Sequence, residues 1–404
     1  MISLNRHVLA RTLASAAVSI VFLVASASAS YAVTTSRVDG QGGGGGRILA
    51  HISGDTAGVG RSGVPWVFYG ANPGAGWRLR VAKLAAGTTV YETLDGTGGT
   101  NGRTGDSVGS DVSAVQLNGV PNVFYYDDTT GALRRAWYQS GSWSFQTVDG
   151  TSTSGGRTTR DVGLHSSAIV VNGQINVFYA DATAGDIRRA VWNGTTWQFS
   201  VIDGNSTVGG RTTSTVGSGI ATGVWGSSLR VLYSKPSSGL RMATLSGTSW
   251  TYRAMSSLGN ADVSVLVTSP TEVHVAYIEG DPGSASYPIY SALWNGTTWS
   301  VDERVSYSES QIPSSVVLFD DAGTPALATG LLVCYGSGGC DNIDGVGKWN
   351  GTSFNDPYFG DWYWFANGHN PGRPSSVVTV GGVPQLFIGD WGGNHLLFRA
   401  VGPF

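Results

Sequence analysis

LRRAWYQSGSWSFQTVDG, residues 133–150, recurs 54 positions later as IRRAVWNGTTWQFSVIDG, residues 187–204. Both stretches alternate apolar and polar residues around a central turn and end in Asp-Gly, which is typical of paired β-strands. The Asp-Gly marker recurs with nearly the same spacing, at Asp39, Asp95, Asp149 and Asp203. A fixed period of this length is typical of architectures that reuse one supersecondary unit. The sequence therefore predicts a repeat protein.

Each repeat has room for four short strands. In the second repeat the strand patterns cover residues 113–117, 122–126, 132–138 and 143–148. Asn-Gly pairs readily take the positive φ angles of tight hairpins. They are expected to join neighbouring strands at Asn118, Asn172, Asn193, Asn295 and Asn350. Four antiparallel strands in a repeat of this size are typical of a propeller blade.

A second marker sets the number of blades. A Gly-Arg pair follows each Asp-Gly by eight residues, at Arg47, Arg103, Arg157 and Arg211. It returns at Arg373, three periods of 54 after Arg211, so two degenerate repeats lie between them. The chain ends at Phe404 after three strands of the last repeat, whereas residues 34–40 match the fourth. We predict an all-β, seven-bladed propeller whose last blade is closed by the N-terminal strand.

Composition agrees with this fold class and excludes some partners. The chain has 404 residues, with 60 Gly, 14 Trp and 3 Met, which favours strands and tight turns over helices. Its net charge of −3 gives no electrostatic basis for binding nucleic acid. No motif predicts a metal site or a cofactor.

The N-terminus reads as a secretory signal peptide. Residues 1–32 combine a basic start, an apolar stretch at 13–25 and small residues suited to cleavage after Ala29 or Ala32. The apolar stretch is too short to span a bilayer. We expect a secreted, extracellular protein with no membrane span after cleavage and a single propeller domain at 33–404.

Cys334 and Cys340 are the two cysteines of the chain. Export makes a disulfide between them plausible, because extracellular thiols tend to be oxidised. We predict a bond that closes this one loop.

Propeller geometry divides the connections between two faces. The loop face carries the blade-to-blade loops and the second-to-third strand loops, and the hairpin face carries the short turns. Long loops on a rigid scaffold usually hold binding sites, so we expect function on the loop face. The aromatic tract near residues 361–373 is expected there as a ligand platform or a channel plug, through Trp362, Tyr363 and Trp364.

The recurring arginines have two interpretations. They either lock neighbouring blades together or donate hydrogen bonds to a ligand in each groove between blades. As candidate ligand contacts we name Arg47, Arg103, Arg157, Arg211 and Arg373. No nucleophile or metalloprotease motif appears in a suitable context. The Asp127/Asp128 and Asp320/Asp321 pairs could supply glycosidase carboxylates, although neighbouring turn residues are more often solvated.

The repeat core quoted above resembles that of secreted bacterial seven-bladed propeller lectins and, more distantly, the fucose-binding propeller lectins of fungi. The resemblance implies carbohydrate or glycoconjugate binding at repeated sites between blades on one face. The sequence favours this lectin-like function over an enzyme. One alternative is a glycoside hydrolase or polysaccharide lyase with a single site near residues 361–373. A second alternative is an exported propeller with a structural or protein-binding role.

Overall fold

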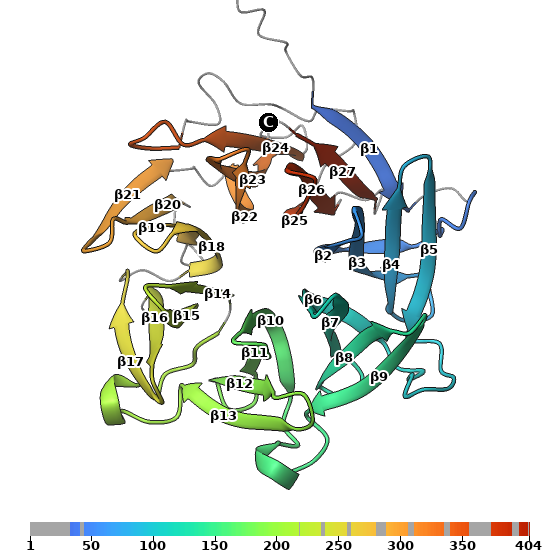
Figure 1. The fold of residues 1–404 in the computed structure, drawn as a ribbon, viewed down its shortest axis with the longest axis horizontal. Coiled ribbons are helices and arrows are strands. Elements are labelled where there is room, and N and C mark those ends of the chain that lie inside the picture. The colour runs from blue at the N-terminus through green and yellow to red at the C-terminus, as the bar shows by residue number, and fades with distance from the viewer. Residues whose placement is uncertain are drawn as a thin grey trace, which may run out of the picture. The chain divides into compact units, whose positions relative to one another are not determined.

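Seven antiparallel sheets succeed one another around a common axis in the computed structural model (Figure 1). The structure describes residues 33–40, 44–217, 219–235, 239–256, 260–279, 288–305, 311–334, 340–354, 373–389, 396–402 and 404. Residues Val33–Phe404 form one compact unit. The all-β, seven-bladed propeller expected from the repeats is confirmed.

Blades 1 to 4 each contain four strands in chain order from the axis outward. Blade 1 consists of β2 (His51–Arg61), β3 (Val64–Asn72), β4 (Arg78–Ala85) and β5 (Thr88–Asp95). Blade 2 consists of β6 (Val108–Leu117), β7 (Val120–Asp127), β8 (Ala132–Gln139) and β9 (Ser142–Asp149). Blade 3 consists of β10 (Val162–Val171), β11 (Gln174–Asp181), β12 (Asp186–Trp192) and β13 (Trp197–Asp203). Blade 4 consists of β14 (Ile220–Trp225), β15 (Ser228–Lys235), β16 (Gly239–Ser246) and β17 (Ser249–Ala254).

The remaining blades complete the ring. Blade 5 consists of β18 (Asn260–Ser269), β19 (Glu272–Glu279), β20 (Ile289–Trp294) and β21 (Trp299–Val305). Blade 6 has three described strands, β22 (Gln311–Asp321), β23 (Thr324–Cys334) and β24 (Cys340–Lys348). Blade 7 consists of β25 (Arg373–Val380), β26 (Val383–Gly389), β27 (Leu397–Val401) and, as its outer strand, β1 (Thr34–Asp39). The predicted closure by the N-terminal strand is confirmed, because β1 pairs with β27 from Thr34↔Val401 to Asp39↔Leu397.

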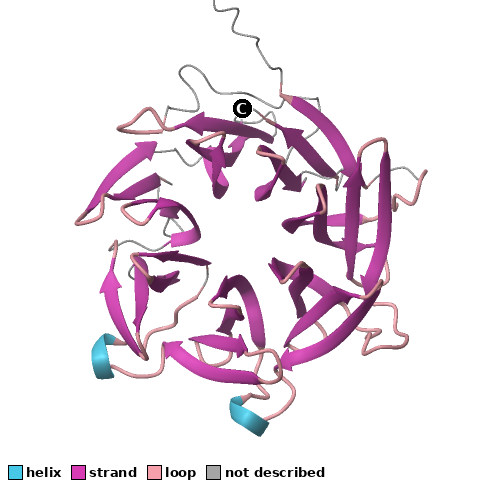
Figure 2. Cartoon of the chain, viewed as in Figure 1, coloured by secondary structure: helices cyan, strands magenta, loops and turns pink. Residues whose placement is uncertain are grey.

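Tight turns join the strands, and helical structure is scarce in the described residues. In the described residues, the helical segments are two short 3-10 turns, η1 (Ser154–Gly156) and η2 (Val208–Gly210), at the outer rim (Figure 2). Asn118 and Asn172 take the predicted positive φ, at 51° and 50°. Asn193 joins the last two strands of its blade as predicted, but the positive φ expected of it was wrong. Its side-chain oxygen instead accepts the Thr195 and Thr196 N–H groups in a longer turn, and Gly194 alone takes a positive φ.

Buried aspartates join successive blades. Asp149 lies in blade 2, and its carboxylate accepts two hydrogen bonds from blade 3. The donors are the Tyr179 hydroxyl at 2.7 Å and Arg188 Nε at 3.0 Å. The same three-residue contact, with the aspartate fully buried, recurs as Asp39–Tyr69–Arg80, Asp95–Tyr125–Arg134 and Asp203–Tyr233–Arg241. The partner of each aspartate is therefore a third-strand arginine, not the arginine of the Gly-Arg marker.

Outer-strand indoles fill the apolar space between blades. Trp143 packs edge-to-face on Phe68 of the preceding blade, and Trp197 packs on Phe124 in the same way, with ring centroids about 6 Å apart. Trp250 repeats the contact with Phe178. Within the described ranges, no helix has the length and hydrophobicity needed to cross a membrane.

Candidate functional site

The arginines of the Gly-Arg marker lie at the outer rim. Four of them follow the outer strand of one blade and reach an aromatic ring on the outer strand of the next. Arg103 lies over Phe145 at 5.3 Å and Arg157 over Phe199 at 5.7 Å, measured to the ring centroids. Arg47 and Arg211 donate to the hydroxyls of Tyr91 and Tyr252 at 3.4 and 3.1 Å. These contacts hold each blade-to-blade loop against the next blade.

Several residues to which the sequence analysis assigned a role lie wholly or in part outside the described residues. Trp362, Tyr363 and Trp364 are outside them, as are the side chain of Arg373 and residues 1–32. β23 and β24 place Cys334 and Cys340 directly opposite each other in the antiparallel register. No disulfide is found among the side chains that the structure describes, and these two are not among them. The bond stays a prediction.

Three aspartates and a histidine gather on the loop face. We call Asp55, Asp111, Asp128 and His165 the acidic cluster. Asp55, Asp111 and His165 lie near the starts of β2, β6 and β10, the innermost strands of blades 1, 2 and 3 (Figure 1). Asp128 directly follows β7, so its side chain belongs to the same face.

Irregular backbone positions two members of this cluster. The β6–β7 register shifts between Ser110 and Ser113, and the β10–β11 register shifts between Leu164 and Ser167. Asp111 and His165 occupy these bulges with φ angles of 49° and 53°. Left-handed backbone is unfavourable for residues other than glycine and tends to mark functional sites. Bulges of this kind reorient side chains beside active sites.

The surroundings of Asp111 favour its protonated form. Burial is the main cause that raises the pKa of this carboxyl, and the negative charges of Asp55 and Asp128 act in the same direction. His165 opposes them, since its main-chain N–H donates to Asp111 Oδ1 at 2.9 Å and its Nδ1 lies 3.4 Å from the same oxygen. A carboxyl with a raised pKa is better suited to act as a general acid than an ordinary aspartate.

Asp128 has a different environment. It is exposed, and its two oxygens accept the Ser110 hydroxyl at 3.0 Å and the Ser107 hydroxyl at 3.4 Å. Burial raises its pKa, while both hydroxyl groups stabilise its charged form. Nearby, the Tyr126 hydroxyl donates to Asp161 at 2.7 Å. Burial and this bond raise the pKa of Tyr126, so the phenol stays neutral.

A pocket of about 600 Å³ opens beside the cluster. Its lining includes Asp55, Ser110 and the half-buried indole of Trp77, which lies in the β3–β4 loop. Ser110 also donates a hydrogen bond to Asp128, so the pocket adjoins the acidic cluster. Indole faces suit the apolar faces of sugar rings, and the volume is that of a small-molecule site. In the described part of the chain, no group of three or more His, Cys, Asp or Glu residues could hold a metal ion.

Sequence reasoning considered Asp128 but missed the other three members of the cluster, although a signal was present. Asp55, Asp111 and His165 each follow an Asp-Gly aspartate by 16 residues. They therefore occupy one position in three successive repeats, and Gly219 takes the same position in the fourth. This position carries different residues in different blades, as one asymmetric site requires.

Known proteins resemble the chain in fold but not in sequence. No family model and no curated protein matches it. Among solved structures it is similar to a polysaccharide lyase, an ulvan lyase bound to -[GlcA(1-4)Rha3S]-, at 12% identity, 88% of this chain, 94% of that chain and a TM-score of 0.51. It is also similar to an α-L-arabinofuranosidase of Fusarium graminearum with arabinobiose (13% identity, 75% and 95% coverage, TM-score 0.46). The likeness to the lyase shows the propeller fold.

Proposed function

We propose that this protein is a carbohydrate-active enzyme that hydrolyses glycosidic bonds at the acidic cluster. The observation that carries the proposal is Asp111, a carboxyl whose pKa is raised by burial and by two neighbouring carboxylates. Paired carboxyl groups with different protonation states are the working parts of glycoside hydrolases. The Trp77 indole in the adjoining pocket offers a surface for a sugar ring.

The residues have distinct roles in this reaction. Asp111 donates its proton to the glycosidic oxygen as the bond from that oxygen to the anomeric carbon breaks. Water adds to the anomeric carbon, and Asp128, held by Ser110 and Ser107, takes the water proton. One water molecule is consumed, and the starting state returns when Asp128 releases its proton to solvent and Asp111 takes one up. His165 orients the Asp111 carboxyl through its main-chain N–H.

This enzyme function was the alternative to a lectin with repeated sites, and the site geometry favours it. A lectin with equivalent grooves needs the same donors in each repeat. The acidic cluster instead places Asp, Asp and His at one repeat position. The rim arginines that suggested repeated sites are engaged with aromatic rings, which supports their structural interpretation. Extracellular location is part of the proposal and rests on the sequence of residues 1–32.

The test is product analysis on a panel of neutral polysaccharides and uronate polymers. Ulvan belongs in the panel because the lyase of similar fold was solved with an ulvan-type saccharide. Hydrolysis predicts new reducing ends without unsaturated sugars. Products with a C4–C5 double bond would instead indicate a lyase, which would have to bind a uronate beside three aspartates against like-charge repulsion. Binding without any product would support the lectin.

A further inference from the structure

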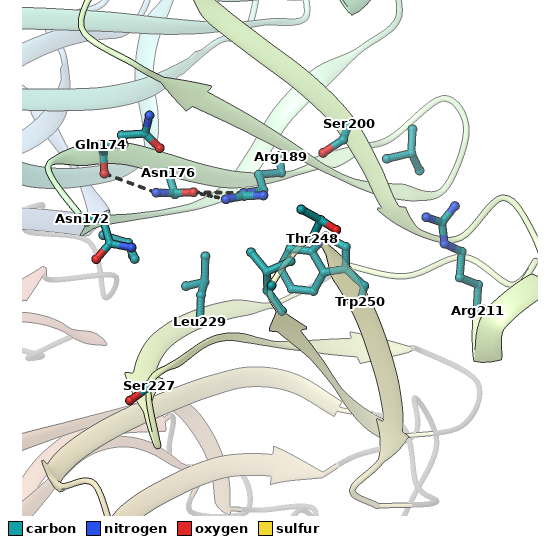
Figure 3. A pocket seen from close by; sticks show the side chains of 14 residues that line it. Asn172, Gln174, Asn176, Arg189, Ser200, Arg211, Ser227, Leu229, Thr248 and Trp250 are labelled. Atoms are coloured by element: carbon teal, nitrogen blue, oxygen red, sulfur yellow. Dashed lines mark hydrogen bonds between the residues drawn. The ribbon is translucent and has the colours of Figure 1, made fainter.

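A second pocket, of about 690 Å³, lies between blades 3 and 4 (Figure 3). Asn172 and Ser227, from the first turns of the two blades, line it together with Thr248 from the last turn of blade 4. These turns belong to the hairpin face, opposite the acidic cluster. The pocket thus involves the face on which the sequence predicted only short turns. The volume suits a ligand of one or two sugar units.

The wall of this pocket carries a cation with no anionic partner. Arg189 of β12 is half-buried, and its Nε and Nη2 both donate to Asn176 Oδ1, at 3.0 and 2.5 Å (Figure 3). Among the described residues, no carboxylate pairs with Arg189, and burial lowers its pKa. Arg211 also lines the pocket, whereas no aspartate or glutamate does. The pocket is thus positively charged in a protein whose net charge is −3.

The preceding junction shows what makes this pocket open. There Arg135 donates to Asn122 Oδ1 at 2.9 and 2.6 Å, the same pairing 54 residues earlier. Its guanidinium is covered by the rings of Trp137, Trp192 and Trp197, and only 5% of the residue is exposed.

At the open junction two of the three covering indoles are absent. Val191 stands two residues after Arg189, where Trp137 follows Arg135. Leu245 pairs with Trp250 across β16–β17, where Trp192 pairs with Trp197. The indole of Trp250 remains, with its centroid 5.6 Å from the guanidinium. Leu245, which lines the pocket, is smaller than the indole at the matching position of the preceding junction and leaves space there.

We propose that this pocket is a binding site for an acidic sugar, one whose ring carries a carboxylate or a sulfate group. A half-buried guanidinium whose hydrogen bonds go to a neutral amide gains a counter-charge when an oxyanion binds beside it. Arg211 adds a second positive charge at the outer end of the pocket. The indole of Trp250 provides a flat apolar surface for the ring, and amide and hydroxyl groups at Asn172, Gln174 and Thr248 can bond the sugar hydroxyls. An isolated inorganic anion would leave most of the volume unused.

The site is independent of the proposed hydrolysis, because it shares no lining residue with the acidic cluster or with the pocket beside that cluster. We would titrate the full-length protein with tri-galacturonate, sulfated galactose, a neutral galactose trisaccharide and inorganic sulfate, following tryptophan fluorescence. We expect tri-galacturonate or sulfated galactose to bind at least tenfold more tightly than the neutral trisaccharide, and the comparison of the two tells which oxyanion is preferred. Equal affinity for the neutral and acidic sugars would overturn the proposal. Binding of inorganic sulfate as tight as that of both acidic sugars would overturn the sugar assignment.

Two variants test the location. Arg189→Met should reduce acidic-sugar binding at least tenfold by removing the charge. Leu245→Trp should do the same by restoring the indole that closes the preceding junction. Arg135→Met, the matched change in the closed junction, should leave binding unchanged in a protein whose melting curve shows it is folded. Wild-type affinity in Leu245→Trp would overturn the proposal. Its hydrolytic activity on a short neutral substrate should be unaffected, which separates this site from the acidic cluster.

Discussion

The main-chain N–H of His165 donates to the Asp111 carboxylate at 2.9 Å, and its imidazole Nδ1 lies 3.4 Å from the same oxygen. The two residues occupy one position in consecutive repeats, and both hold left-handed backbone. Repetition thus brings unlike side chains together across a blade junction. Strain of this kind persists only where the surrounding structure enforces it, which here is the paired bulges of β6 and β10.

The pH dependence of hydrolysis should move in opposite directions in two variants. Asp111 must be protonated to act as the acid, so kcat/KM should fall as pH rises through its raised pKa, above the ordinary value of about 4. Asp55→Asn removes a negative charge that raises this pKa, so the falling limb should move to lower pH. His165→Gln removes an opposing positive charge, so the limb should move to higher pH. Shifts in the same direction for both variants, measured on kcat/KM profiles, would contradict the assignment of Asp111.

The buried contact of Asp149 with Tyr179 and Arg188, which joins blades 2 and 3, should contribute strongly to stability. Asp149→Ala removes the acceptor of Tyr179 and Arg188 and leaves the guanidinium buried without a counter-charge. Removing one partner of a buried ion pair typically costs about 3–5 kcal/mol. Urea denaturation should report a loss of that size. As a control, Asp320→Ala at an exposed turn should change the free energy of unfolding by less than about 1 kcal/mol. Similar losses of unfolding free energy in the two variants would show that the Asp149 contacts stabilise the protein no more than an exposed turn does.

Cys334 and Cys340 should form a disulfide in protein made in an oxidising compartment. Directly opposite residues in an antiparallel ladder have Cα atoms roughly 4.5 to 5.5 Å apart, within the range a disulfide spans. Mass spectrometry without reductant should find no thiol that can be alkylated. For so short a loop, the chain-entropy contribution is about 2 kcal/mol, so Cys334→Ser should lower stability modestly. Two alkylated thiols in native exported protein would rule the bond out.

The N-terminal strand should be needed for a closed ring. A truncation that starts at residue 41 removes β1 and with it the pairing to β27 and the Asp39 contacts to Tyr69 and Arg80. It should expose the edge of β27, lower the Tm and promote self-association. The matched truncation that starts at residue 33 keeps β1 and should melt like the full chain. Light scattering and thermal melting of the two truncations make the comparison, and equal behaviour would argue against closure by β1.

The repeat period made the fold predictable from the sequence. The number of blades followed from the markers, and the closure followed from a fourth strand that is missing at the C-terminus and present at residues 34–40. The partner of each Asp-Gly aspartate did not follow. Arg134 and Arg135 are neighbours, and strand alternation alone cannot say which one faces the preceding blade. The structure directs Arg134 to Asp95 and Arg135 to Asn122.

The sites were less predictable because they depend on departures from the repeat. The spacing of 16 residues could have grouped Asp55, Asp111 and His165, yet the bulges that aim them leave no mark in the residue types. The pocket beside Arg189 is lined by Leu245, where the preceding junction has the larger indole of Trp192. A deletion of packing volume becomes visible only when two junctions are superposed in three dimensions.

The most direct test of the account is the rate of reducing-end release by Asp111→Asn on the best substrate of the wild type. The amide has nearly the same shape but no proton to donate, so the rate should fall by about a hundredfold or more. The Tm and the binding of the same substrate should stay close to wild type. Wild-type rates in a folded Asp111→Asn variant would contradict hydrolysis at the acidic cluster.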